Sequence, residues 1–178
     1  SSIIFFVAIS IIVYFYASDM TAHFEGDSVR YDFIAQHFGF LKTVPLEALG
    51  YPFFLFLIYT IFGHSMGAVV TVQVILSICC LFLFRRIAGK LGGIWAQTGV
   101  TLLWTLNLGF LIYSQLLLIE VIIALFYLLF IERVIAFYEQ PSLGKIAQSG
   151  LILGLSMLFK PAALFYALCF TIFLLLMR

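Results

Sequence analysis

The sequence has 178 residues, of which 65% are hydrophobic and 10% are charged, and its mean hydropathy is +1.20. Soluble domains average about 45–50% apolar and about 25% charged residues, so this chain lacks the polar side chains to cover a surface in water. The formal net charge of +1 excludes partners held by charge, such as nucleic acid. The composition predicts an all-α fold: a polytopic transmembrane helical bundle, one module over residues 1–178, surrounded by membrane lipids.

The first predicted spanning helix covers residues 2–17, near the length of roughly 20 residues that a bilayer requires. A polar segment follows at residues 19–49 and holds five of the eight acidic residues of the chain. A segment of this length is too long for a turn. We therefore expect a long first outer loop over residues 18–67.

Two interfacial helices are expected within this loop, over about residues 28–41 and 51–62. In the first, Val29 and Phe33 recur at helical spacing and Asp32 falls on the opposite side, which is typical of an amphipathic helix along a membrane surface. The second is apolar, but a dozen residues give a helix of only about 18 Å, too short to span a bilayer.

Five further spans are predicted after the outer loop. The last two are separated at Lys160-Pro161, because a charge in mid-bilayer costs at least about 2.5 kcal/mol and proline removes a helix hydrogen bond. In the stretch before this break, Gly150 and Gly154 have the spacing that permits close contact between two helices. The predicted spans cover residues 68–84, 94–113, 116–131, 146–159 and 162–177.

The basic residues predict the side that each loop faces. Loops rich in Lys and Arg remain in the cytoplasm, and Arg85 and Arg86 end the second span abruptly. The first outer loop and the break at Lys160 then lie outside. The predicted cytoplasmic residues are Arg85, Arg86, Lys90, Arg133, Lys145 and Arg178, whereas Arg30, Lys42 and Lys160 are predicted to be outside.

The two ends of the sequence also carry expectations. The chain begins without Met and stops at Arg178 directly after an apolar run, so we expect a piece of a longer protein. Residues 3–17 have the length of a signal-peptide apolar region, but no basic residues precede them, and Tyr16 stands where cleavage requires a small residue. A retained first helix fits these residues better.

Asp27 is the first candidate for chemistry. A carboxylate at the outer face of a membrane can act as a general base or bind a metal ion. Asp27 also opens the amphipathic helix, and Asp is among the best residues for capping a helix N-terminus. The two roles are compatible, because a cap holds its carboxylate in place.

Asp27, Glu25 and His23 are the candidate metal ligands. Together with Asp19 they offer the oxygen and nitrogen atoms that divalent cations bind. Their spacing matches no defined metal motif, and a loop facing water is polar in any case. A divalent metal cofactor and an ordinary solvated loop are therefore both open readings.

Glu120, Lys160 and Arg30 are the other charged candidates. Glu120 lies between apolar runs, so it should face a cavity or a partner, where it would orient a substrate hydroxyl, pair with a cation or mark the outer end of a helix. Lys160 would neutralise an anionic lipid headgroup as a point charge, or simply extend to the interface. Arg30 is a weaker candidate for the same phosphate.

Four short motifs occur in a characteristic order. They are Gly26-Asp27 followed by Tyr31 and Ala35, Gly50-Tyr51-Pro52 leading to Gly63, Glu120 at the start of a span, and Gly150-x-x-x-Gly154-Leu155 followed by Lys160-Pro161. This order resembles the membrane glycosyltransferases of the GT-C fold, in particular their protein mannosyltransferase-like and aminoarabinose transferase-like group. The resemblance covers nearly the whole chain, which would be the N-terminal transmembrane module.

The resemblance implies an inverting transfer of a sugar from a polyprenyl-phosphate donor to a lipid, glycan or protein acceptor outside the cytoplasm. Asp27 corresponds to the essential Asp of the family and would deprotonate or orient the acceptor hydroxyl. Lys160 and Arg30 would bind the donor phosphate, whose charge they or a metal would stabilise as it leaves. Tyr31 and Glu120 would orient the substrate.

The chain also departs from the family pattern. Many members have a second acid beside the essential Asp, where this chain has Ser28, and they have Pro-Pro where it has Glu47-Ala48-Leu49. The family continues with more helices and often a soluble domain, so the 178 residues alone would be catalytically incomplete.

Two other functions fit the composition. A transporter or lipid-handling protein would carry ionisable residues within its spans or paired broken helices, whereas here the spans are nearly free of charge and the acids collect in one outer loop. A non-catalytic scaffold with the same fold is the third reading. For all of them we expect a multi-pass protein of a bacterial or archaeal plasma membrane, with its site outside the cytoplasm.

Overall fold

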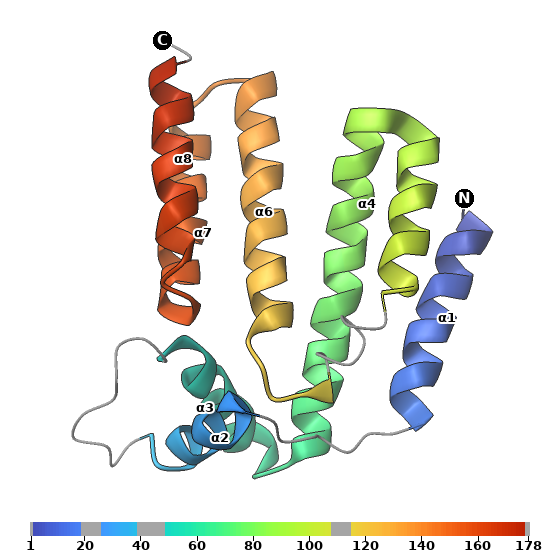
Figure 1. Ribbon diagram of the computed structural model, residues 1–178, viewed down its shortest axis with the longest axis vertical. Coiled ribbons are helices and arrows are strands. Elements are labelled where there is room, and N and C mark those ends of the chain that lie inside the picture. The colour runs from blue at the N-terminus through green and yellow to red at the C-terminus, as the bar shows by residue number, and fades with distance from the viewer. Residues whose placement is uncertain (1, 19–25, 39–48, 108–114, 177–178) are drawn as a thin grey trace.

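The computed structural model describes residues 2–18, 26–38, 49–107 and 115–176, and these are almost entirely helical, as the predicted all-α class requires (Figure 1). Seven helices are found in these ranges. They are α1 (Ser2–Ser18), α2 (Asp27–Gln36), α3 (Gly50–Phe62), α4 (Met66–Thr105), α6 (Glu120–Glu139), α7 (Leu143–Phe159) and α8 (Ala163–Leu176).

Two helices, α4 and α6, are long and apolar enough to cross a membrane. The apolar helices α1, α3, α7 and α8 are shorter than this criterion requires. Helices α4, α6, α7 and α8 run side by side, α1 packs against α4, and α2 and α3 lie across one end of this bundle (Figure 1). The predicted pair of short helices between the first and second spans is therefore present as α2 and α3.

Helix α4 is a hairpin with its turn at Gly92 and Gly93. The backbone of Gly93 has φ 65° and ψ −151°, a region that essentially only glycine adopts. The second predicted span ends at residue 84, whereas the helix continues past Arg85 and Arg86 up to this turn. Their charges ended the apolar pattern but are compatible with a helix, since arginine has a high helix propensity.

Helix α6 also differs from its predicted bounds of 116–131. It begins at Glu120 and ends at Glu139, so only residues 140–142 connect it to α7. The sequence pattern placed the helix end near Glu132, where the first charges appear. Glu132 does not end the helix, because it is buried, with 3% of its surface exposed, and pairs with Arg86 of α4 and with Arg133.

Charged side chains gather around Glu132, between α4 and α6. Arg133 donates from Nη2 to Glu132 Oε2 at 2.9 Å. Arg86 Nε lies 3.0 Å from Glu132 Oε1, an ion pair without hydrogen-bond alignment. A second ion pair joins the same two helices, with Lys90 Nζ 2.9 Å from Glu139 Oε2. Basic residues that were predicted to face the cytoplasm thus lie together and join α4 to α6.

Helix α2 ends earlier than predicted, at Gln36 instead of residue 41, and residues 39–48 lie outside the described part of the chain. It packs on α3 with its small side chains, because Ser28 and Ala35 are almost fully buried. Val29 and Phe33 are exposed by 60% and 57% on its other side. An apolar exposed side of this kind is what an interfacial helix would turn towards lipid.

Helices α3 and α7 approach closely at Gly50, the first residue of α3. A Cβ at this position would lie 2.6 Å from the backbone oxygen of Leu158 in α7. The predicted contact at Gly150 and Gly154 is wrong for the described residues, since nothing there lies within 4 Å of a Cβ at either position. Both glycines are exposed on α7, on a side that no described helix covers.

Gly50→Ala is expected to lower the free energy of unfolding by about 1–3 kcal/mol, because the new methyl group meets backbone that must shift. Gly154→Ala is the matched control. It is expected to raise stability by about 0.5–1 kcal/mol, since alanine favours a helix and the space is open. Unfolding in detergent micelles, followed by far-UV circular dichroism, measures both. Equal effects of the two changes would contradict the close contact at Gly50.

Candidate functional site

Asp27 is the first residue of α2, and its side chain is exposed. The residue before it, Gly26, occupies the N-cap position with φ 53°, and no side chain caps this helix end. The capping role considered for Asp27 is therefore wrong. Its carboxylate lies in the first helical turn, where the backbone N–H groups and the helix dipole favour a negative charge.

Tyr31 lies one turn after Asp27 along α2 and contacts α3. Its ring packs edge to face on Tyr51 of α3, with the ring centroids 5.2 Å apart. Burial raises the pKa of Tyr31, and the nearby negative charges of Asp27 and Glu120 raise it further, whereas Arg30 lowers it. The phenol of Tyr31 is therefore within electrostatic reach of both carboxylates, which come from helices far apart in the sequence.

Glu120 is the first residue of α6, and the sequence motif also predicts it at the start of a helix. Its Oε2 atom is buried and makes no hydrogen bond to any residue that the structure describes. A chain of hydrogen bonds fixes the segment before it: Tyr51 donates to Gln73 Oε1 at 2.6 Å, and Gln73 Nε2 donates to the backbone oxygen of Leu116 at 2.9 Å. Burial raises the pKa of Tyr51 well above its usual value, so it remains a phenol and a donor.

Tyr51→Phe is expected to lower the free energy of unfolding by about 1–2 kcal/mol, because it removes a hydrogen bond between two buried side chains. The control is Tyr14→Phe, since Tyr14 is 77% exposed and its change should stay within about 0.5 kcal/mol. Urea unfolding in detergent compares the two variants with wild type. A Tyr51 variant as stable as the control would remove the bond to Gln73 from the account of how Glu120 is positioned.

Lys160 ends α7, and its side chain is exposed. The turn between α7 and α8 lies at the same end of the bundle as α2 and α3 (Figure 1). Phe159, the residue before it, packs on the buried cluster that includes Tyr51, and Tyr31 packs on the same cluster. Arg30 is exposed on α2. The two predicted phosphate-binding cations thus lie at the end of the molecule where Asp27 and Glu120 are found.

An apolar cavity of about 450 Å³ lies between α3 and α7, next to Lys160. The residues that line it are all apolar, so the cavity suits a hydrocarbon chain. The lining residues are Phe38, Leu49, Gly50, Phe53, Phe54, Leu57, Leu155, Leu158 and Phe159.

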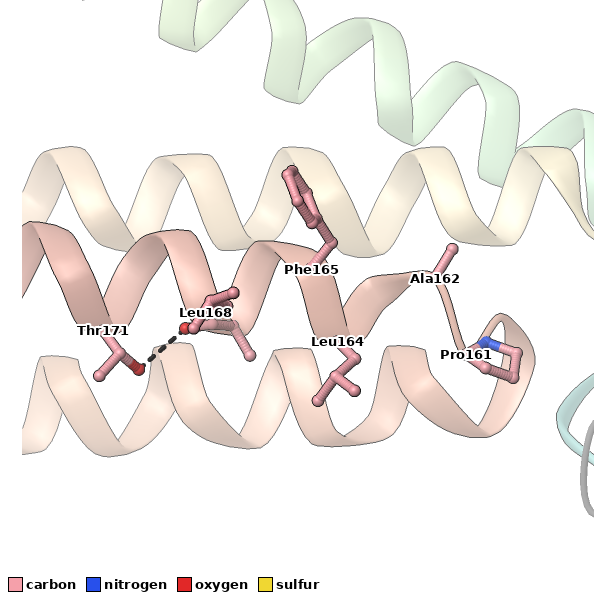
Figure 2. Close-up of a pocket in the computed structure, with 7 residues that line it drawn as sticks. Pro161, Ala162, Leu164, Phe165, Leu168 and Thr171 are labelled. Atoms are coloured by element: carbon pink, nitrogen blue, oxygen red, sulfur yellow. Dashed lines mark hydrogen bonds between the residues drawn. The ribbon is translucent and has the colours of Figure 1, made fainter.

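A second apolar hollow, of about 670 Å³, lies along α8 and the turn before it (Figure 2). Figure 2 shows that Leu164, Phe165 and Leu168 project from this helix. The hydroxyl of Thr171 donates to the backbone oxygen of Ala167 at 2.9 Å, so it is used within the helix. This hollow carries no charged group and is not a candidate site for chemistry.

The predicted metal ligands are only partly visible. Glu25 and His23 lie outside the described residues, so their position relative to Asp27 stays a prediction. Within the described ranges, no group of three or more His, Cys, Asp or Glu side chains is arranged to hold a metal ion. The residues brought together around Tyr31 are two acids and one cation, without a histidine.

A polar cluster around Asp32 was not predicted as a site. Tyr59 donates to Asp32 Oδ1 at 2.6 Å, His64 Nε2 lies 3.0 Å from the same oxygen, and Gln36 donates to Oδ2 at 2.7 Å. These residues come from α2, from α3 and from the turn before α4. In the sequence, Asp32 and Gln36 are four residues apart on the polar side of α2, and this spacing indicates that their side chains can contact each other.

Comparisons with protein families, with curated proteins and with solved structures find no match to this chain.

Proposed function

We propose that the chain is the N-terminal transmembrane module of a GT-C-type membrane glycosyltransferase. It would transfer a sugar from a polyprenyl-phosphate donor to a lipid, glycan or protein acceptor. The observation that supports this best is the meeting of Asp27, Tyr31 and Glu120 at one end of the helical bundle, next to an apolar cavity. A lipid-linked sugar has the matching chemistry, since its polyprenyl tail is hydrocarbon and its sugar and phosphate are polar.

Each part of the donor has a candidate partner. The polyprenyl tail would lie in the cavity between α3 and α7, whose walls are apolar. The phosphate would be held by Lys160, beside the cavity, and by Arg30, because both offer a positive charge at this end. Glu120 has a buried carboxylate oxygen without a hydrogen bond, and a sugar hydroxyl would satisfy it. Tyr31 would help to orient the same sugar.

The reaction would be a single displacement with inversion at the anomeric carbon. The acceptor oxygen forms the new bond as the bond from the anomeric carbon to the phosphate oxygen breaks, and the electron pair leaves with the polyprenyl phosphate. Asp27 would deprotonate or orient the acceptor hydroxyl. Its position in the first turn of α2 supports this role, because the helix dipole favours a negative charge at this end. A divalent metal would assist phosphate departure if Glu25 and His23 complete a site with Asp27.

A multi-pass arrangement is part of the proposal. In it, α1, the two arms of α4, α6, α7 and α8 span the membrane, and α2 and α3 lie at the outer interface. The cations joined to Glu132 and Glu139 would then face the cytoplasm, in keeping with the positive-inside rule. A transporter or a scaffold is the rival function, and the acids at the end of the bundle favour chemistry at the surface over a path through it.

The test uses the full-length protein in native membranes and a panel of radiolabelled polyprenyl-phosphate sugars. We expect release of free polyprenyl phosphate together with transfer of the label to an acceptor. Release without an acceptor product would indicate hydrolysis and contradict transfer. Movement of the intact lipid between leaflets, without release, would support the rival lipid-handling function. No release from any donor would overturn the proposal.

A further inference from the structure

The polar cluster around Asp32 lies at the end of the bundle where α2 and α3 are found (Figure 1). We propose that the Asp32–His64 pair accepts the proton of the acceptor hydroxyl, and that Asp27 orients the acceptor without taking this proton. The inference rests on the proposed function for the identity of the hydroxyl, but the proton-accepting pair itself stands on geometry. Asp32 belongs to α2 and His64 follows the end of α3, so the pair joins these two helices.

The carboxylate of Asp32 favours a proton on Nε2 of His64. Its Nε2 atom is 3.0 Å from Asp32 Oδ1 and also 3.0 Å from the amide nitrogen of Gln36. The amide of Gln36 already donates to the other oxygen of Asp32. A proton on Nε2 is attracted to the carboxylate, so the neutral ring keeps its lone pair on Nδ1. The side chain of His64 is 49% exposed and accessible to a substrate.

Tyr59 fixes the carboxylate in this pair. Burial raises the pKa of Tyr59, and its hydrogen bond to Asp32 and the charge of Asp32 raise it further. Tyr59 therefore stays protonated and donates to Asp32 at neutral pH. The carboxylate accepts from Tyr59, His64 and Gln36, and only 13% of its side chain is exposed. Such an acceptor orients the imidazole and stabilises the imidazolium that forms when His64 takes a proton.

The helix geometry separates the two acids of α2. Five residues along a helix turn the side-chain direction by about 140°, so Asp27 and Asp32 point to different sides. An imidazole is a better base near neutral pH than a carboxylate, because its pKa lies closer to the working pH. In the step that we propose, the acceptor proton passes to His64 Nδ1 as the acceptor oxygen attacks the anomeric carbon. The electron pair of the broken bond leaves with the phosphate, and His64 later releases the proton to water.

The first test reads the tautomer of His64 by nitrogen-15 NMR on the full-length protein in lipid nanodiscs. We expect the neutral ring of His64 to carry its proton on Nε2, and Asp32→Asn to abolish this preference. His37 is an internal control with the opposite tautomer, since its Nδ1 bonds to the backbone oxygen of Phe33 at 2.9 Å. His64→Gln assigns the signal. A proton on Nδ1 of His64, or no response to Asp32→Asn, would overturn the pair.

The second test measures sugar transfer. His64→Ala is expected to lower the turnover rate about 10²-fold or more, and added imidazole is expected to restore a measurable part of it. His37→Ala is the matched control and should retain wild-type turnover. A loss that imidazole does not restore, or full activity of His64→Ala, would overturn the proton-accepting role. If wild type transfers no sugar from any donor, the proposed function fails, and the tautomer measurement still decides whether the pair exists.

Discussion

Asp27→Asn is expected to lower the rate of sugar transfer about 10²- to 10⁴-fold in the full-length protein, with expression and insertion unchanged. The change removes the negative charge and keeps the size of the side chain. Because Gly26, and not Asp27, occupies the N-cap position, the substitution leaves the start of α2 intact. A loss of activity would therefore report on chemistry and not on folding of the helix.

Two measurements make this result interpretable. Far-UV circular dichroism and the yield in membranes should match wild type, since Asp27 is exposed and caps nothing. Ser28→Ala is a poor control, because Ser28 is buried, whereas Val29→Ala changes an exposed neighbour and should transfer sugar normally. Equal transfer by wild type and Asp27→Asn would remove Asp27 from the reaction and leave it an ordinary residue of the first helical turn.

Replacing both arginines beside Glu132 is expected to cost about 3–5 kcal/mol of stability, the largest loss predicted from the described contacts. Arg86→Met combined with Arg133→Met leaves the carboxylate of Glu132 without its counter-ions, although it is only 3% exposed. Glu132→Leu alone should cost much less. Arg86 and Arg133 remain partly exposed, so water can solvate their charges once the carboxylate has gone.

The triple variant separates the cost of the buried charge from the loss of packing. Glu132→Leu added to the two methionine changes should recover most of the stability, since no uncompensated charge then remains. Arg86→Lys with Arg133→Lys keeps the positive charges and controls for any effect on membrane orientation. Urea unfolding in detergent measures the free energy of unfolding of the four variants and of wild type. A double-methionine variant as stable as wild type would show that Glu132 is solvated or protonated in the folded state.

The short helices α2 and α3 were predictable because glycine marks their limits. Gly26, Gly50 and Gly63 stand at the ends of α2 and α3, and the residues between them follow helical spacing. The helix ends within α4 and α6 were not predictable from hydropathy. Arg85 and Glu132 interrupt apolar runs, but each finds a partner from another element, and such partners do not appear in a local pattern. Arg85, for example, donates to Thr101 across the hairpin at 2.6 Å.

The candidate site was predictable as a set of residues but not as a geometry. Asp27, Tyr31 and Glu120 were selected from motifs, and the structure brings Tyr31 within electrostatic reach of both carboxylates. The hydrogen bonds that Gln73 makes with Tyr51 and Leu116 were not predicted. Gln73 is nevertheless recognisable in the sequence as a polar side chain inside an apolar run. The Asp32–His64 pair was missed because its members are 32 residues apart and neither belongs to a recognised motif.

The pKa of Tyr31 depends on charges from two helices, so it can report whether these helices are packed together. Asp27 belongs to α2 and Glu120 to α6, and α2 reaches the bundle chiefly through α3. If α2 and α3 were to move together away from α6, Tyr31 would lose the charge of Glu120, and its pKa would fall towards that of a free phenol. An ultraviolet titration, taken as the difference between wild type and Tyr31→Phe, would therefore show whether α2 and α3 are packed on the bundle, without any substrate.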